Sequence, residues 1–149
     1  MGPDLDKLLK FCRKNVSVIT IYKIGIELLQ YLKLIHESGY VYIDLSCKNI
    51  GLLFNPTGNN KITNHITLID FGFCETYVSK GNLHLEKAQA PRENGNIYYS
   101  SINALSGGPI SRKDDIISLC YLLIDLYKIL PWAGINWDSN GKKETIKKK

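Results

Sequence analysis

The stretch GYVYIDLSCKNIGLLF, residues 39–54, places a polar loop between two short apolar runs. The loop holds one carboxylate, Asp44, one ammonium, Lys48, and one amide, Asn49. A plain hairpin would instead carry Gly, Pro or Asn-Gly at its tip. We therefore interpret this loop as a candidate functional site between two strands.

The segments around the loop predict a fold of the α+β class that is mainly α-helical, with short β-hairpins expected at this loop and at the loop that follows residues 66–69. Apolar residues at helical spacing predict a long helix over residues 18–36, which Gly39 would end. Asp4 is a candidate N-cap for a shorter helix before it. The buried stripe of the long helix would contain Val18, Ile21, Tyr22, Leu28, Leu29, Leu32 and Ile35. Strands are expected at residues 40–43, 50–53 and 66–69, an irregular segment at 73–101, and a helix buried on most sides at 114–127.

The net charge of +5 is concentrated at one end of the 149-residue chain. The last eight residues, KKETIKKK, contain five lysines and one glutamate, so they supply +4. The basic character is therefore no evidence for a specific nucleic-acid-binding face. We expect a solvated helix face or a frayed end, and the alternative is a weak, salt-sensitive contact with nucleic acid or an anionic membrane.

The cysteines are widely spaced and form no C-x-x-C pair, which argues against a zinc site or a disulfide framework. Free thiols in a reducing compartment are the better interpretation. The N-terminus is polar, unlike a signal peptide, and the most apolar run, residues 116–127, is too short to span a bilayer. We expect a cytoplasmic or nuclear protein without a membrane span.

Two strand ends carry acidic groups that are close in sequence. Asp44 and Asn49 share the polar loop between the strands expected at residues 40–43 and 50–53, which we call the opening loop. Asp70 follows the strand expected at residues 66–69. Mg²⁺ favours one or two carboxylates and an amide oxygen, and a separate carboxylate can deprotonate an attacking hydroxyl. The residues alone leave two interpretations open: a phosphate and magnesium site, or aspartates that only form turns with nearby backbone N–H groups.

The order of the motifs resembles that of protein kinases. D-x-x-x-x-N, from Asp44 to Asn49, and I-D-F-G, residues 69–72, are similar to the catalytic loop and the metal-binding motif. RENGNIYYSSINA, SRKDDIISLCYLLIDL and LPWAG resemble the casein kinase 1 superfamily, which includes the vaccinia-related kinases. That superfamily has Ser-Ile-Asn where other kinases have Ala-Pro-Glu, and residues 101–103 read Ser-Ile-Asn.

The resemblance implies a role for each matching residue. Asp44 would be the catalytic base that accepts the proton of the substrate hydroxyl. Asn49 and Asp70 would bind Mg²⁺ and, with Gly72, belong to the ATP site. Gly72 would permit the backbone turn after the metal-binding aspartate. Asp115 would hold the backbone of the catalytic loop.

Several positions depart from the pattern of the family. Tyr42 and Ile43 replace the usual histidine and arginine, so switching by phosphorylation of the activation loop is not expected. Ser46 replaces the lysine two places after Asp44. Lys48 stands where some tyrosine kinases have an arginine and could restore the charge, although it lacks the planar fork. Loss of one preorganised donor typically costs on the order of 10²–10³-fold in rate.

Two further departures concern the nucleotide and the catalytic aspartate. Gly51 replaces the apolar floor of the adenine pocket. Residues 95–98 read Gly-Asn-Ile-Tyr where the family has Gly-Thr-Ala-Arg. The threonine that supports the catalytic aspartate and the arginine that would bind a phosphate already on the substrate are both replaced.

The resemblance implies a partial protein kinase domain over residues 1–149, equivalent to a C-terminal lobe from the hinge to just beyond the central helix. The N-terminal lobe and the last helices of the C-terminal lobe would be absent. We expect a fragment of a casein-kinase-1-like Ser/Thr kinase, which transfers the γ-phosphoryl group of Mg·ATP to protein hydroxyls and has little activity alone. The alternative is a catalytically impaired pseudokinase that binds or regulates a protein partner.

Overall fold

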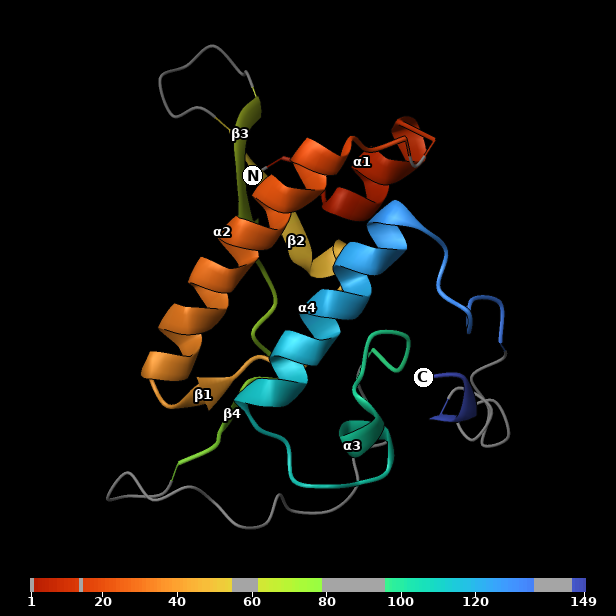
Figure 1. Cartoon of the computed structure of the whole chain (residues 1–149). Coiled ribbons are helices and arrows are strands. Elements are labelled where there is room, and N and C mark those ends of the chain that lie inside the picture. Colours follow the sequence, from red (N-terminus) through yellow and green to blue (C-terminus); the bar gives the residue numbers. More distant parts are fainter. Residues whose placement is uncertain (1, 14, 55–61, 79–95, 136–145) are drawn as a thin grey trace.

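Two long helices, α2 (Val18–Glu37) and α4 (Arg112–Tyr127), lie side by side and form the frame of the chain (Figure 1). The computed structural model describes residues 2–13, 15–54, 62–78, 96–135 and 146–149. The other elements are α1 (Leu5–Phe11), β1 (Tyr40–Val41), the 3-10 turn η1 (Cys47–Asn49), β2 (Ile50–Phe54), β3 (Ile62–Leu68), β4 (Glu75–Thr76) and α3 (Ile102–Leu105). The described part is therefore α+β, with short strand pairs, as the sequence predicts. Much of the expected irregular segment, at residues 79–95, lies outside the described residues.

Capping side chains set the helix boundaries. Asp4 accepts a hydrogen bond from the Lys7 N–H at 2.8 Å, so the predicted N-cap of α1 is confirmed. Just after the C-terminal end of α2, Gly39 has φ +85°, a backbone conformation that residues with a side chain rarely adopt. A Cβ at Gly39 would also lie 2.9 Å from the Val78 side chain, so glycine is needed here for two reasons.

The buried face of α2 differs from the predicted stripe. Its buried residues are Ile21, Ile24, Gly25, Leu28 and Leu32, while Val18, Tyr22 and Leu29 are exposed. Gly25 explains the difference, because a Cβ there would lie only 3.0 Å from Leu123 of α4. The two helices approach each other along the side that carries this glycine, and the predicted stripe omits it.

α4 is buried on one side only, which corrects the expectation of burial on most sides. Asp115, Leu119 and Leu122 face the core, whereas Ile124 and Tyr127 are exposed. The low polarity of this helix therefore reflects two apolar faces, of which the described chain covers one.

The strands on either side of the opening loop do not pair with each other. β1 pairs antiparallel with β4, and β2 pairs antiparallel with β3. The loop is thus not the tip of a hairpin, which corrects the expected hairpin at this site. β1 also ends at Val41, because the next two backbone N–H groups donate to a side chain of α4 rather than to a strand.

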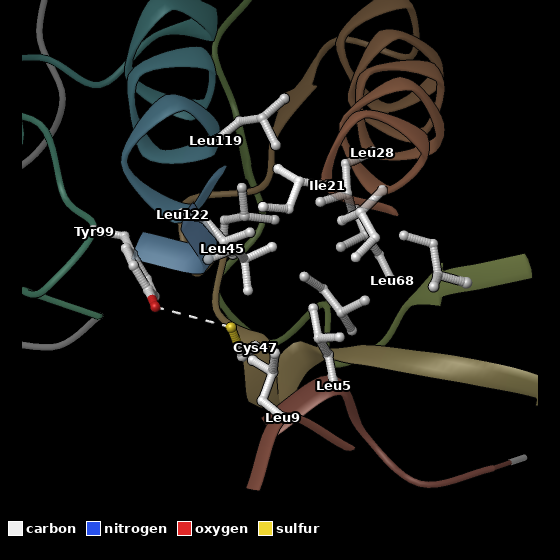
Figure 2. Close-up of a cluster of buried hydrophobic side chains, with 14 of the residues drawn as sticks. Leu5, Leu9, Ile21, Leu28, Leu45, Cys47, Leu68, Tyr99, Leu119 and Leu122 are labelled. Carbon is white, nitrogen blue, oxygen red and sulfur yellow. Dashed lines mark hydrogen bonds between the residues drawn. The ribbon is translucent and has the colours of Figure 1, made fainter. Parts of the chain in front are cut away.

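The opening loop is anchored in the hydrophobic core, and we call residues 42–49 the candidate loop. Leu45 is 1% exposed and Cys47 is buried as well. Figure 2 shows both side chains among leucines from α1, α2 and α4. Burial of these two residues leaves the polar residues on either side of them, Asp44, Lys48 and Asn49, closer to the surface.

No helix in the described ranges is long and apolar enough to cross a membrane. All four cysteines are free thiols, as expected.

Candidate active site

A buried carboxylate from α4, Asp115, holds the start of the candidate loop. Its Oδ1 accepts a hydrogen bond from the Ile43 N–H at 2.8 Å, and its Oδ2 accepts one from the Tyr42 N–H at 2.8 Å. His36 Nε2, at the end of α2, lies 2.7 Å from the same Oδ2. Ile43 has φ +72°, a left-handed conformation that β-branched residues rarely adopt. Asp115 thus holds a strained backbone directly before Asp44, the function that the resemblance implied.

Tyr42 joins the candidate loop to the chain around Asp70. Its hydroxyl donates to the carbonyl of Ile69, and its ring contacts the Phe71 ring edge to face at a centroid distance of 5.6 Å. Burial, with smaller contributions from nearby carboxylates, raises the pKa of Tyr42 well above its usual range, so the hydroxyl stays a donor. The Ile69 N–H also donates to the Asn49 carbonyl at 2.9 Å. These contacts hold the Ile-Asp-Phe-Gly segment, residues 69–72, against the candidate loop.

Donors on two sides hold the Asp44 carboxylate. Asn49 Nδ2 donates to Asp44 Oδ2 at 2.7 Å and to the Asp44 carbonyl at 2.8 Å. The Asn96 N–H donates to Asp44 Oδ1 at 3.0 Å. The threonine that supports this aspartate in the family is replaced by Asn96, yet the carboxylate does not lack a donor on this side. A backbone N–H supplies the hydrogen bond instead.

The residues fit a magnesium ion by donor type. Because Asn49 Nδ2 is bound to Asp44, the amide oxygen of Asn49 is the atom left to bind a cation. Asp70 adds an exposed carboxylate, and its backbone is in the left-handed region with φ +61°. Within the described ranges no three His, Cys, Asp or Glu side chains are grouped to hold a metal by themselves. A cation here would therefore rely on amide, carboxylate and nucleotide oxygens, which is the ligand set that Mg²⁺ prefers.

Gly72 acts through a close approach rather than through an unusual backbone angle. The left-handed residue of this turn is Asp70, and Gly72 is not left-handed. The Gly72 N–H donates to Asp70 Oδ1 at 3.1 Å, and a Cβ on Gly72 would lie 3.1 Å from the same oxygen. The reason that we expected for the glycine is thus corrected: its small size leaves the carboxylate accessible.

The structure does not bring Lys48 to Asp44. Lys48 is exposed on η1 and makes no hydrogen bond or ion pair within the described part of the chain. Ser46, at the usual lysine position, is buried, and its carbonyl accepts the Asn49 N–H at 3.0 Å. The role of Lys48 toward a transferring phosphate stays a prediction.

The Ser-Ile-Asn motif is tied to the start of α4, next to Asp115. Ser101 Oγ donates to Asp114 Oδ1 at 2.5 Å, and Asn103 Nδ2 donates to the same oxygen at 3.2 Å. The other oxygen, Asp114 Oδ2, accepts the Ser111 N–H at 2.8 Å. Two adjacent acids of α4 thus hold two separate segments of the site.

Sequence reasoning missed a contact between the candidate loop and the far end of α4. The Tyr99 hydroxyl lies 3.8 Å from Cys47 Sγ, a contact drawn as a dashed line in Figure 2, and it donates to Asp125 Oδ2 at 2.9 Å. The Tyr98 hydroxyl donates to Asp125 Oδ1, also at 2.9 Å. One signal could have revealed this contact: Asp125 interrupts an otherwise apolar run, and a carboxylate there needs donors.

Comparisons with known proteins found a matching family model and several similar proteins. A family model described as "Protein kinase domain" matches residues 1–149. Casein kinase I homolog 2 of Schizosaccharomyces pombe is 31% identical over 145 residues, which are 96% of this chain and 33% of the relative. Casein kinase I homolog 1 of the same organism is 32% identical over 147 residues, 96% of this chain and 32% of the relative. The B1 kinase of vaccinia virus (strain Western Reserve) is 30% identical over 143 residues, 94% of this chain and 45% of the relative. The chain therefore spans less than half the length of these curated relatives.

Proposed function

The chain belongs to the protein kinase family, and on that premise we propose that it is part of a casein-kinase-1-like Ser/Thr kinase. The kinase would transfer the γ-phosphoryl group of ATP to a hydroxyl of a protein substrate. The observation that carries the proposal is the Asp44 carboxylate, which is fixed by Asn49 on one side and by the Asn96 N–H on the other. A turn-forming aspartate would bond to nearby backbone only.

In this proposal Asp44 orients the substrate hydroxyl and accepts its proton as the oxygen attacks the γ-phosphorus. The new O–P bond forms while the bond to the β-phosphate oxygen breaks, and ADP leaves. Mg²⁺, held by Asn49 and Asp70, would supply positive charge for the phosphate oxygens. Asn49 would have two tasks, because its Nδ2 already restrains Asp44 and its oxygen is left for the cation.

We further propose that residues 1–149 are a partial kinase domain and need groups from an N-terminal lobe. Most of the catalysis in phosphoryl transfer comes from positioning and charge neutralisation. A lobe that covers the phosphates supplies a large share of both. We therefore expect little transfer by this chain alone.

The test is a fusion of residues 1–149 to the N-terminal lobe of casein kinase I homolog 2 of Schizosaccharomyces pombe. We expect Mg²⁺-dependent ATP binding by calorimetry and phosphorylation of protein hydroxyls. Asp44→Asn should keep ATP binding and lower transfer by at least a hundredfold, while Asp70→Asn should lower Mg²⁺-dependent binding. Asp6→Asn, which neutralises a carboxylate of α1 instead, is the matched control. A fusion that does not bind Mg·ATP would falsify the proposal.

The second candidate is a pseudokinase that binds or regulates another protein. The buried Ser46 favours it, because it stands where the family has the lysine that contacts the transferring phosphate. ATP binding by the fusion without any transfer, and equal behaviour of the Asp44→Asn variant, would support this candidate over the first.

A further inference from the structure

The Lys149 ammonium contacts two aromatic rings and two backbone carbonyl oxygens. Its Nζ is 4.8 Å from the centre of the Tyr121 ring and 5.0 Å from the centre of the Trp132 ring. It also donates to the carbonyl of Ser100 and, at 3.4 Å, to the carbonyl of Ile97. Two aromatic faces and two carbonyl oxygens are the groups that bind a desolvated cation. This contact contradicts the expected solvated tail, as far as Lys149 is concerned.

The carbonyls that Lys149 contacts belong to one tight turn, residues 96–100. The Asn96 carbonyl accepts the Ser100 N–H at 3.1 Å and the Ser100 hydroxyl at 2.9 Å. The Asn96 side-chain oxygen accepts the Tyr98 N–H at 3.1 Å. Because these bonds close the turn on itself, a group that holds Ser100 also holds Asn96.

The same turn restrains the proposed catalytic base, since the Asn96 N–H donates to Asp44 Oδ1. We propose that Lys149 is a positioning residue for Asp44. Its ammonium fixes the 96–100 turn against α4 and so sets the hydrogen bond from Asn96. The catalytic meaning of this contact rests on the proposed function, whereas the contact itself does not.

Lys149 differs from the other groups that hold the turn. Trp132 Nε1 donates to the Tyr98 carbonyl at 2.8 Å, and the Tyr98 hydroxyl donates to Asp125. These bonds, and the bond from the Tyr99 hydroxyl to Asp125, reach residues in the middle of the turn. Lys149 instead joins the carbonyls near both ends of the turn to the aromatic rings, so removing its charge leaves two half-buried acceptors without that donor.

The test measures amide hydrogen exchange by NMR on the full 149-residue chain at about pH 6.5. Burial lowers the pKa of Lys149 to about 8, so the ammonium is charged under these conditions. We expect the Asn96 amide to exchange roughly ten- to a hundredfold faster in Lys149→Gln, because a charged hydrogen bond is lost. Lys149→Arg should retain most of the protection. Lys147→Gln removes an exposed lysine of the same tail and should change nothing.

Two further readouts separate positioning from general stability. Exchange in the middle of α2 should be unchanged in Lys149→Gln. In the wild-type chain, ring currents should move the Lys149 side-chain protons upfield relative to those of Lys147, which requires no variant. Unchanged Asn96 exchange, or Lys149 protons at ordinary shifts, would overturn the inference. Inactivity of the kinase fusion would overturn only the proposed function.

Discussion

Asp44 receives its second hydrogen bond from a backbone N–H, although the side chain at position 96 differs from the family pattern. A backbone donor is available whatever the side chain, provided that the turn holds it in place. Asn96 contributes its own side chain to the turn, through the bond from the Tyr98 N–H. A replaced side chain at this position is therefore compatible with a supported carboxylate.

Cys74, two residues after the Asp-Phe-Gly motif, should react slowly with alkylating reagents. Burial, with smaller effects of Asp115 and Asp70, raises its pKa to about 11, so only about one thiol in a thousand is ionised at pH 8. We expect iodoacetamide at pH 8 to modify the exposed Cys12 and Cys120 first. The rate at Cys74 should continue to rise with pH until about pH 11, because the thiolate is the reactive form.

Peptide mass spectrometry along a time course would give these rates for each cysteine. Cys47 is buried and serves as the internal reference for a thiol that stays protected in the folded chain. Modification of Cys74 at pH 8 as fast as that of Cys12 would contradict the expected protection.

At the scale of elements, local patterns predicted the helices and strands but not how they meet. The cap at Asp4 and the end at Gly39 depend on a few neighbouring residues, so sequence alone was sufficient. The pairing of β1 with β4, and the bond of Asn96 to Asp44, join residues about 35 or more positions apart. Sequence spacing carries no information about such contacts, and only the family resemblance anticipated the one made by Asp115.

The contact of α2 with α4 at Gly25 leads to a prediction about stability. Gly25→Ile should lower the free energy of unfolding by about 1–3 kcal/mol, because the added side chain must displace Leu123. Gly25→Ala should be close to neutral. Its gain in helix propensity, about 1 kcal/mol, is offset by a 3.0 Å contact with the flexible end of Leu123.

Urea unfolding would measure both changes. Lys23→Ile places the same β-branched side chain on the exposed side of α2 and should cost only a few tenths of a kcal/mol. Leu123→Ala should recover part of the loss in the Gly25→Ile background, since the two sites share one space. Equal stability of Gly25→Ile and the wild type would show that the helices are not in close contact there.

At the scale of the whole molecule, both long helices carry an exposed apolar row. On α2 it consists of Ile19, Tyr22, Ile26 and Leu29, and on α4 of Ile116, Ile124 and Tyr127. The two rows approach each other at a groove of about 800 Å³, which Leu29 and Ile116 line together. Exposed apolar residues gathered on one face of a helix commonly mark a contact with another protein.

We therefore expect the 149-residue chain to associate with itself at high micromolar concentration. Tyr22→Lys combined with Ile26→Lys should lower the associated fraction several-fold, because charges in the row must be desolvated in a contact. Sedimentation velocity over a concentration series would measure it. Ser106→Lys adds an exposed charge at the end of α3, outside both rows, and should leave association unchanged. A monomeric wild type at every concentration would mean that the exposed apolar rows alone do not drive self-association. Association that Ser106→Lys weakens as much as the double variant would indicate that net charge, rather than the apolar row, controls it.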